Sequence, residues 1–119
     1  MERIVLVDDH AAFAQALELV LGQVEGTEVA LARPLEEGRT LIGSGEPFDL
    51  VLLDLTLPDG EGTELVAEIR RSHPETPIVV LSAREDADEA ASMAGADAAI
   101  SKETPLPDMI SSLRRLADQ

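Results

Sequence analysis

The chain has 119 residues, of which 45% are hydrophobic and only 2% aromatic, so a single domain with an aliphatic core is expected. Its 24 acidic and 9 basic side chains give a formal net charge of −15, which argues against direct nucleic-acid binding by this segment. The absence of cysteine excludes a disulfide framework, and the apolar runs are too short to cross a bilayer. We therefore expect a cytoplasmic protein without a membrane segment.

Strand-like runs alternate with segments whose apolar residues recur at helical spacing. The predicted elements, in chain order, are a strand at 4–7, a helix through 13–21 that Gly22 or Gly26 ends, a strand at 28–32, a helix at 35–42, a strand at 48–53, a loop at 57–60, a helix through 65–69 that ends before Pro74, a strand at 78–81, a helix at 87–94, a strand at 98–100 and a helix through 109–116.

This alternation is typical of βαβ units with right-handed crossovers. The continuous apolar runs of the first, third and fourth strands favour a parallel sheet that is covered on both faces. We therefore predict an α/β fold, a flavodoxin-like doubly wound five-stranded parallel sheet of (βα)5 type with strand order 2-1-3-4-5. In such a sheet, ligands bind beyond the carboxyl ends of the strands.

Polar and charged side chains stand at those strand ends. They are Asp8, Asp9, Asp54, Ser82 and Lys102. Because the first and third strands are neighbours in this order, the three carboxylates are expected to share one crevice, bordered by a hydroxyl and an ammonium. Singly, each residue has a plainer interpretation: Asp8 and Ser82 could cap helices, and Lys102 could be solvated. Their occurrence at one end of one sheet favours a site.

Carboxylates held this close repel each other unless they are protonated or bridged by a cation. Oxygen ligands without cysteine favour a hard ion, and Mg²⁺ is the expected one. An acidic cleft with a metal and one lysine suits phosphoryl transfer, in which a carboxylate can be the nucleophile. We interpret His10 as a loop residue near the crevice, and as neither a metal ligand nor a general base.

These residues belong to longer motifs, namely Leu6-Val7-Asp8-Asp9-His10, the segment from Asp54 to Gly62, Ser82-Ala83, Gly95-Ala96-Asp97 and Lys102. With them in this order, the chain resembles a response-regulator receiver domain over essentially its whole length, residues 1–119. Any C-terminal output domain is expected to be absent from this chain. The Asp-Asp-His opening and the Lys102-Glu103 pair most resemble the NarL/FixJ (LuxR-type) group, whose members carry a helix-turn-helix DNA-binding domain.

The resemblance implies that Asp54 accepts a phosphoryl group from a histidine kinase or a small acyl-phosphate donor. It implies that Mg²⁺ is bound by Asp8, Asp9, Asp54 and the Thr56 backbone carbonyl, and that Ser82 and Lys102 contact the phosphoryl group. The implied output is a switched protein-interaction surface that controls a DNA-binding domain in transcription regulation. A homodimer through the last helices fits the family. We expect self-catalysed phosphorylation and dephosphorylation, and no turnover enzyme.

One position departs from the family. Ala99 stands three residues before Lys102, where the family usually has Tyr or Phe. Phe13 and Phe48 lie on other elements, so we expect no aromatic ring near Ala99 and another route from the pocket to the surface. The alternative function is therefore a receiver-like interaction module that does not depend on phosphorylation.

Two other classes are disfavoured. A flavodoxin-like cofactor binder would need a glycine-rich phosphate loop after the first strand, and none is present. A phosphatase of the haloacid-dehalogenase type would need a second aspartate two residues after Asp54, and Thr56 stands there.

Overall fold

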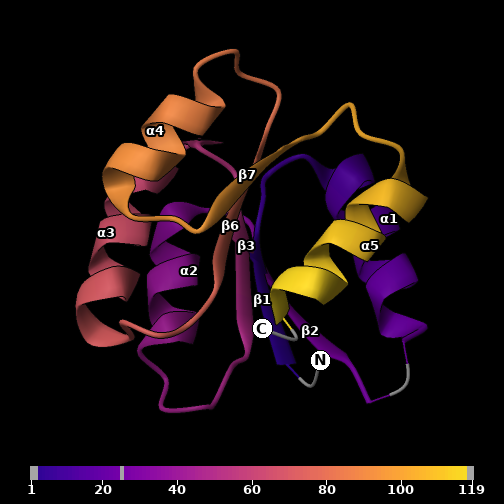
Figure 1. Cartoon of the computed structure of the whole chain (residues 1–119). Helices are drawn as coiled ribbons and strands as arrows, with labels where there is room; N and C mark the ends of the chain where they lie inside the picture. Colours follow the sequence, from indigo (N-terminus) through magenta and orange to yellow (C-terminus); the bar gives the residue numbers. More distant parts are fainter. Residues whose placement is uncertain (1–2, 25, 118–119) are drawn as a thin grey trace.

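A central sheet of five parallel strands has helices packed on both of its faces (Figure 1). The structure is a computed structural model that describes residues 3–24 and 26–117, so both ends of the predicted 1–119 span lie outside the described residues. In chain order the elements are β1 (Arg3–Val7), α1 (Ala11–Gly22), β2 (Glu28–Ala32), α2 (Leu35–Ile42), β3 (Leu50–Leu53), β4 (Thr56–Leu57), β5 (Gly60–Glu61), α3 (Gly62–Ser72), β6 (Ile78–Ser82), α4 (Ala87–Ala94), β7 (Ala98–Ser101) and α5 (Leu106–Ala117).

The sheet has the order β2-β1-β3-β6-β7, with every neighbouring pair parallel. This confirms the predicted doubly wound sheet and its 2-1-3-4-5 order, counted over the five strands of that sheet. In the register of β1 against β3, Val7 lies opposite Leu53. The residues that follow these two strands therefore leave the sheet side by side.

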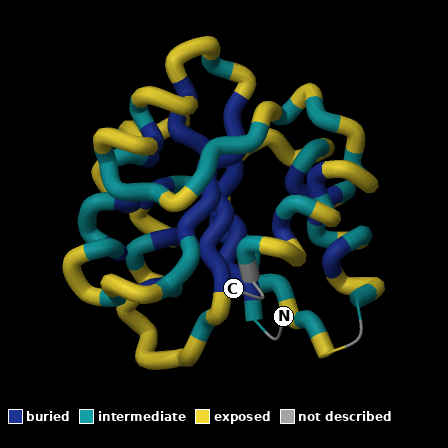
Figure 2. The backbone as a smooth tube through the Cα atoms, viewed as in Figure 1, coloured by how far each residue is buried: buried dark blue, intermediate teal, exposed yellow. Residues whose placement is uncertain are grey.

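Burial on both faces explains the continuous apolar runs. Along β1, Val5 and Val7 face a core formed with α2, α3 and α4, whereas Ile4 and Leu6 face a second core formed with α1 and α5. All four are fully buried. Figure 2 shows the strands as the most buried part of the chain, between helices whose outer surfaces are exposed. Each strand is thus apolar at successive positions because alternate side chains enter different cores.

The third strand begins later than predicted. The sequence favours a strand over 48–53, but β3 begins at Leu50. The Phe48 ring instead packs on the His73 ring, with centroids 4.8 Å apart, and the Asp49 carboxylate accepts a hydrogen bond from the Arg3 backbone N–H at 2.9 Å. The Asp49 N–H also donates to the Arg3 carbonyl at 2.8 Å, so the approach to the strand already lies beside β1.

The segment predicted as a loop at 57–60 contains a small hairpin. Its strands, β4 and β5, pair antiparallel, and Leu57 is buried. At the turn, the Asp59 carboxylate accepts the Leu35 N–H at 2.7 Å and the Glu36 N–H at 3.0 Å. The hairpin thereby caps the first turn of α2, where Pro34 at the N-cap has no polar side chain.

Within residues 3–24 and 26–117, no helix combines the length and the apolar character that crossing a bilayer requires.

Candidate functional site

Each of the main predicted site residues stands at, or one residue beyond, the carboxyl end of a strand. Asp8 follows β1, Asp54 follows β3, Ser82 ends β6 and Lys102 follows β7. The hydrogen bonds of the sheet continue into these positions. The Asp54 N–H donates to the Val7 carbonyl at 2.9 Å, and the Lys102 N–H donates to the Ser82 carbonyl at 3.1 Å. The sheet therefore fixes the backbone of the site.

Lys102, the only lysine of the chain, places its ammonium between two buried carboxylates. Its Nζ lies 2.8 Å from Asp8 Oδ2 and 2.9 Å from Asp54 Oδ2. Asp8 is fully buried and Asp54 is 3% exposed. Two ionised carboxylates that contact the same ammonium lie close enough to repel each other, and the single ammonium offsets only part of that repulsion. With both acids ionised, these three side chains carry a net negative charge.

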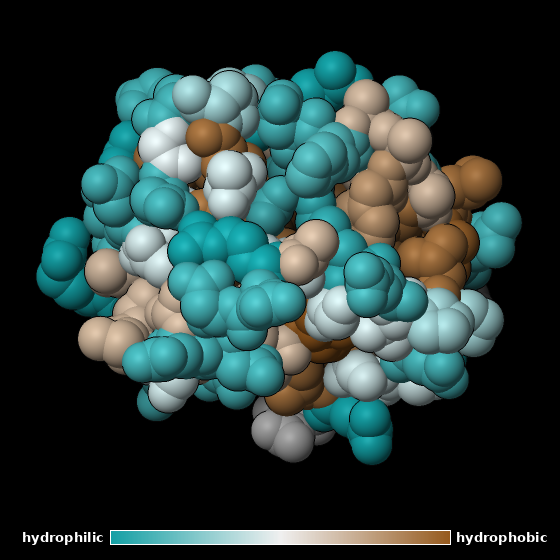
Figure 3. Space-filling view, turned by 90° about the horizontal axis from the view of Figure 1, so that it is seen from above, coloured by the Kyte–Doolittle hydropathy of each residue, from teal (hydrophilic) through white to brown (hydrophobic). Residues whose placement is uncertain are grey.

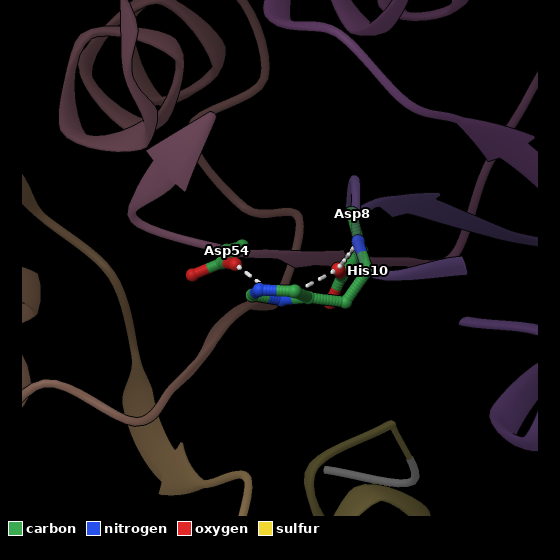
Figure 4. Close-up of side chains that lie close together, drawn as sticks. All are labelled: Asp8, His10 and Asp54. Carbon is green, nitrogen blue, oxygen red and sulfur yellow. Dashed lines mark hydrogen bonds and ion pairs between the residues drawn. The ribbon is translucent and has the colours of Figure 1, made fainter. Parts of the chain in front are cut away.

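His10 contacts this cluster more closely than the sequence indicates. Its Nδ1 lies 2.6 Å from Lys102 Nζ and 3.5 Å from both Asp8 Oδ1 and Asp54 Oδ2. Figure 4 shows the imidazole between the two carboxylates. The His10 backbone N–H donates to Asp8 Oδ1 at 2.7 Å, which holds the residue at the start of α1. The sequence-based interpretation of His10 as a loop residue near the crevice therefore leaves out its contacts with Lys102, Asp8 and Asp54.

One aromatic ring lies beside the ammonium of Lys102. The centroid of the Phe13 ring is 4.8 Å from Lys102 Nζ, within range of a cation–π interaction. Phe13 lies in the first turn of α1, which begins immediately after His10. The spacing of three residues between His10 and Phe13 is the signal that could have indicated it, because residues three apart share a helix face.

The other predicted ligands occupy different positions. Asp9 is exposed, and among the described residues its carboxylate is not part of the group formed by Asp8, His10 and Asp54. Of the three acids that were predicted to converge, Asp8 and Asp54 therefore do so, and Asp9 does not. The Thr56 N–H donates to Asp54 Oδ1 at 3.3 Å, so the segment after β3 turns back over the carboxylate.

Ser82 is buried, and its hydroxyl has a partner within its own turn. Its Oγ accepts the Arg84 N–H at 3.1 Å. Beside it, a hollow of about 200 Å³ is lined by residues that include Ser82, Arg84 and Ala99. The methyl group of Ala99 leaves open part of the space that a larger side chain at this position would fill.

Arg84 was not singled out from the sequence, yet it links the two loops that border the site. Its guanidinium donates to both carboxylate oxygens of Asp86, at 3.0 and 2.8 Å, and lies 2.9 Å from Glu61 Oε2 in the hairpin. The hydrogen bonds with Asp86 raise the pKa of Arg84 above its ordinary value and lower the pKa of Asp86. A long, flexible side chain of this kind gives no periodic signal in the sequence.

The donor set fits a hard divalent cation. Asp8 Oδ2 is buried, and no described residue donates a hydrogen bond to it, so its contact with Lys102 Nζ is ionic only. A buried carboxylate oxygen with a free lone pair, in a cluster of net negative charge, is suited to bind Mg²⁺. Figure 3 views the molecule from the end at which the strands finish. Hydrophilic residues cover much of this face, and the larger hydrophobic areas lie toward the right of the view, with smaller ones at the upper left and at the bottom.

A comparison with protein families finds a match that covers most of the chain. The family described as "Response regulator receiver domain" matches residues 4–114. Among curated proteins, the KDP operon transcriptional regulatory protein KdpE of Escherichia coli is 35% identical over 116 residues, which are 96% of this chain and 50% of that protein. The chain spans half or less of the length of the curated relatives it matches.

Two solved structures show the same fold along nearly the whole chain. A CheY-like receiver domain protein from Methanospirillum hungatei is 32% identical with a TM-score of 0.89, covering 99% of this chain and 94% of that one. The response regulator TrrA from Thermotoga maritima, in complex with Mg²⁺ and BeF, is 30% identical with a TM-score of 0.86, covering 98% and 99%. The particular resemblance to the NarL/FixJ group stays a prediction.

Proposed function

The chain belongs to the response regulator receiver domain family of two-component systems, and on that premise we propose that Asp54 accepts a phosphoryl group in a Mg²⁺-dependent reaction. The observation that carries this proposal is the meeting of Asp54, Asp8 and Lys102, which come from three different strand ends. An acid cluster of net negative charge with one fixed ammonium provides what phosphoryl transfer requires, namely positioning and charge neutralisation.

Asp54 is suited to attack phosphorus. Its Oδ2 contacts Lys102, whereas its Oδ1 accepts one long hydrogen bond, from the Thr56 N–H. In the proposed step an Asp54 oxygen forms a new bond to phosphorus. The P–N bond of a kinase phosphohistidine, or the P–O bond of a small acyl phosphate, breaks, and the leaving group keeps the electron pair. The ammonium of Lys102 then stabilises negative charge on the transferred oxygens.

The proposed metal ligands are Asp8, Asp9, Asp54 and the Thr56 backbone carbonyl. When bound, Mg²⁺ supplies neutralisation of the negative charge that gathers around the phosphoryl group. The free lone pair of the buried Asp8 Oδ2 supports this assignment. The roles of Asp9 and Thr56 rest on the family resemblance.

The proposed switch begins at Ser82. A phosphoryl group adds roughly −1.5 to −2 charge and three strong hydrogen-bond acceptors. We expect the Ser82 hydroxyl to donate to one of these oxygens and to release the Arg84 N–H that it now accepts. Because the Arg84 side chain joins Glu61 to Asp86, movement of this residue would reach both the hairpin and the start of α4. This is a route that needs no aromatic ring at Ala99.

The proposed output is an altered protein-interaction surface around α4 and β7. The matched relatives include a longer protein named as a transcriptional regulatory protein, which supports control of a DNA-binding output domain by this receiver. Direct nucleic-acid binding by this segment is disfavoured by its charge of −15. The same proposal includes a partner histidine kinase, a cytoplasmic location and a homodimer through the last helices. It also includes the absence of turnover on a separate substrate.

A second candidate is a receiver-like module that signals by partner contact without phosphorylation. The small side chain of Ala99 and the hollow beside it favour this candidate. The burial of Asp54 against Lys102 favours phosphorylation. A module that signals by contact alone gains nothing from a buried ion pair, because removing its charges from water costs stability.

Intact-mass spectrometry separates the two candidates. The chain is incubated with acetyl phosphate and Mg²⁺, and in parallel with acetyl phosphate and a chelator. Phosphorylation predicts a mass increase of one phosphoryl group that requires Mg²⁺ and is lost in Asp54→Asn. A folded wild-type chain that gains no mass in either condition would instead support the contact module.

A further inference from the structure

We infer that Asp8, His10 and Asp54 form a binding site for a borderline transition-metal ion of the Zn²⁺ class, with His10 Nδ1 as a ligand. One potential ligand atom from each of the three residues lies within 4.8 Å of the others. The inference concerns metal binding alone and does not depend on phosphoryl transfer to Asp54. It adds an imidazole to a pocket whose proposed Mg²⁺ ligands are all oxygen atoms.

The spacing of the atoms suits a tetrahedral ion. His10 Nδ1 lies 3.5 Å from Asp8 Oδ1 and 3.5 Å from Asp54 Oδ2. Ligands at about 2.0–2.1 Å from Zn²⁺ in tetrahedral geometry lie about 3.3 Å from one another. The two contacts of the imidazole are therefore close to the spacing of a tetrahedral site, and the exposed side of the ring leaves a fourth position open to solvent.

Lys102 marks the place that a cation takes in this cluster. Its Nζ contacts one atom from each of the three residues, at 2.6 Å from His10 Nδ1, 2.8 Å from Asp8 Oδ2 and 2.9 Å from Asp54 Oδ2. Asp8 Oδ2 is also buried without a hydrogen bond from any described residue. A cation that displaced the ammonium would find three converging donors, one of which has a free lone pair.

The nitrogen donor of His10 decides which cation binds this site most tightly. Imidazole nitrogen favours Zn²⁺, Co²⁺, Ni²⁺ and Cu²⁺, whereas Mg²⁺ takes oxygen ligands and retains water. The His10 backbone N–H is held by Asp8 Oδ1 at 2.7 Å, so the ring reaches the pocket at a limited conformational cost. Since a transition-metal ion would use Asp8 and Asp54, it would compete with Mg²⁺ for the phosphoacceptor.

The test is Zn²⁺ binding at pH 7 to the whole chain, measured by competition with a chromogenic chelator and compared with Mg²⁺ binding. We expect His10→Ala to lower the ratio of Zn²⁺ to Mg²⁺ affinity by about tenfold or more, since losing even an outer-shell partner of a metal ligand costs about 10–100-fold. Co²⁺ should give a visible absorption band that changes in His10→Ala. Lys102→Met should bind Zn²⁺ more tightly, because the competing ammonium is gone.

The second histidine of the chain provides a matched control. His73 follows α3 and packs on Phe48, and α3 begins beside Asp54, so His73 lies a helix length away from the site. His73→Ala removes one imidazole and should leave Zn²⁺ affinity unchanged. Equal Zn²⁺ affinity in wild type and a folded His10→Ala, or no tightening in Lys102→Met, would overturn the inference. Either result leaves the mass-spectrometric test of Asp54 phosphorylation unaffected.

Discussion

The backbone of Gly62 lies against the carbonyl of Asp54 so closely that a Cβ atom on Gly62 would fall 2.0 Å from the carbonyl oxygen. The Gly62 N–H also donates to the Leu55 carbonyl at 2.6 Å, so neither backbone can easily move away. Gly62 therefore lets α3 begin directly beside the proposed phosphoacceptor.

We predict that Gly62→Ala destabilises the fold by about 3 kcal/mol, at the upper end of the cost of overpacking, because the added methyl group meets backbone atoms. Urea unfolding measures this change. Gly22→Ala is the control, since a Cβ atom at Gly22 has open space around it and alanine favours a helix by up to about 1 kcal/mol. Equal stability of Gly62→Ala and wild type would contradict the close approach.

The cap that Asp59 provides to α2 predicts a pH dependence. Hydrogen bonds from the Leu35 N–H and then the Glu36 N–H lower the pKa of Asp59 in the folded chain. The unfolded chain has the ordinary value of about 3.9, so the ionised cap contributes its full stability above that pH. The contribution is lost as the pH falls through the lower pKa of the folded state.

Asp59→Asn is accordingly expected to unfold at lower urea concentration than wild type at pH 7. The difference between the two midpoints should be constant down to about pH 5 and should shrink below about pH 3.9, as wild-type Asp59 takes up a proton. A difference that persists unchanged, or grows, at the lowest pH would show that the charge of Asp59 does not stabilise α2.

Arg84→Gln tests the route from the pocket to the hairpin. Arg84 contacts Glu61 at 2.9 Å, and its backbone N–H donates to Ser82 Oγ. On phosphorylation, NMR shift changes at Ser82 should persist in Arg84→Gln, whereas those at Glu61 should be reduced. Arg114→Gln, which changes an exposed arginine of α5, serves as the control. Undiminished changes at Glu61 in Arg84→Gln would rule out this route.

Lys102→Met removes the one ammonium beside Asp54. We expect phosphorylation by acetyl phosphate to slow by about 10²–10³-fold, the cost of losing one fixed group that stabilises transition-state charge. The time course of intact mass measures the rate, and circular dichroism checks the fold. A rate within a factor of about three of wild type would mean that the contact between Lys102 and Asp54 stabilises the resting state only, since such a factor is well under 1 kcal/mol.

Much of the architecture follows from local pattern. The four apolar positions of β1 predict a strand buried on both faces, and the polar residue that follows marks its carboxyl end. Parallel order then brings Asp8 and Asp54 to one edge without knowledge of any contact. The meeting of these acids with Lys102 was predictable because all three positions depend on the backbone of the sheet.

Other features depend on side-chain direction or on contacts between distant loops. His10 and Asp9 are adjacent and both are exposed, yet His10 Nδ1 contacts the cluster, whereas the Asp9 carboxylate is not part of it. The contacts of Arg84 join residues 23 positions apart through a flexible side chain. The hairpin has only two residues in each strand, too few to show an alternating pattern, and it is stabilised partly through the cap that Asp59 gives to α2.

The identity of the acceptor can be read most directly by trapping it. After incubation with acetyl phosphate and Mg²⁺, borohydride reduces an aspartyl phosphate to homoserine, and peptide mass spectrometry locates the altered residue. Phosphorylation of Asp54 predicts homoserine at position 54 alone. Modification at position 8 or 9 with an unaltered Asp54, or no modification of the folded chain, would contradict it.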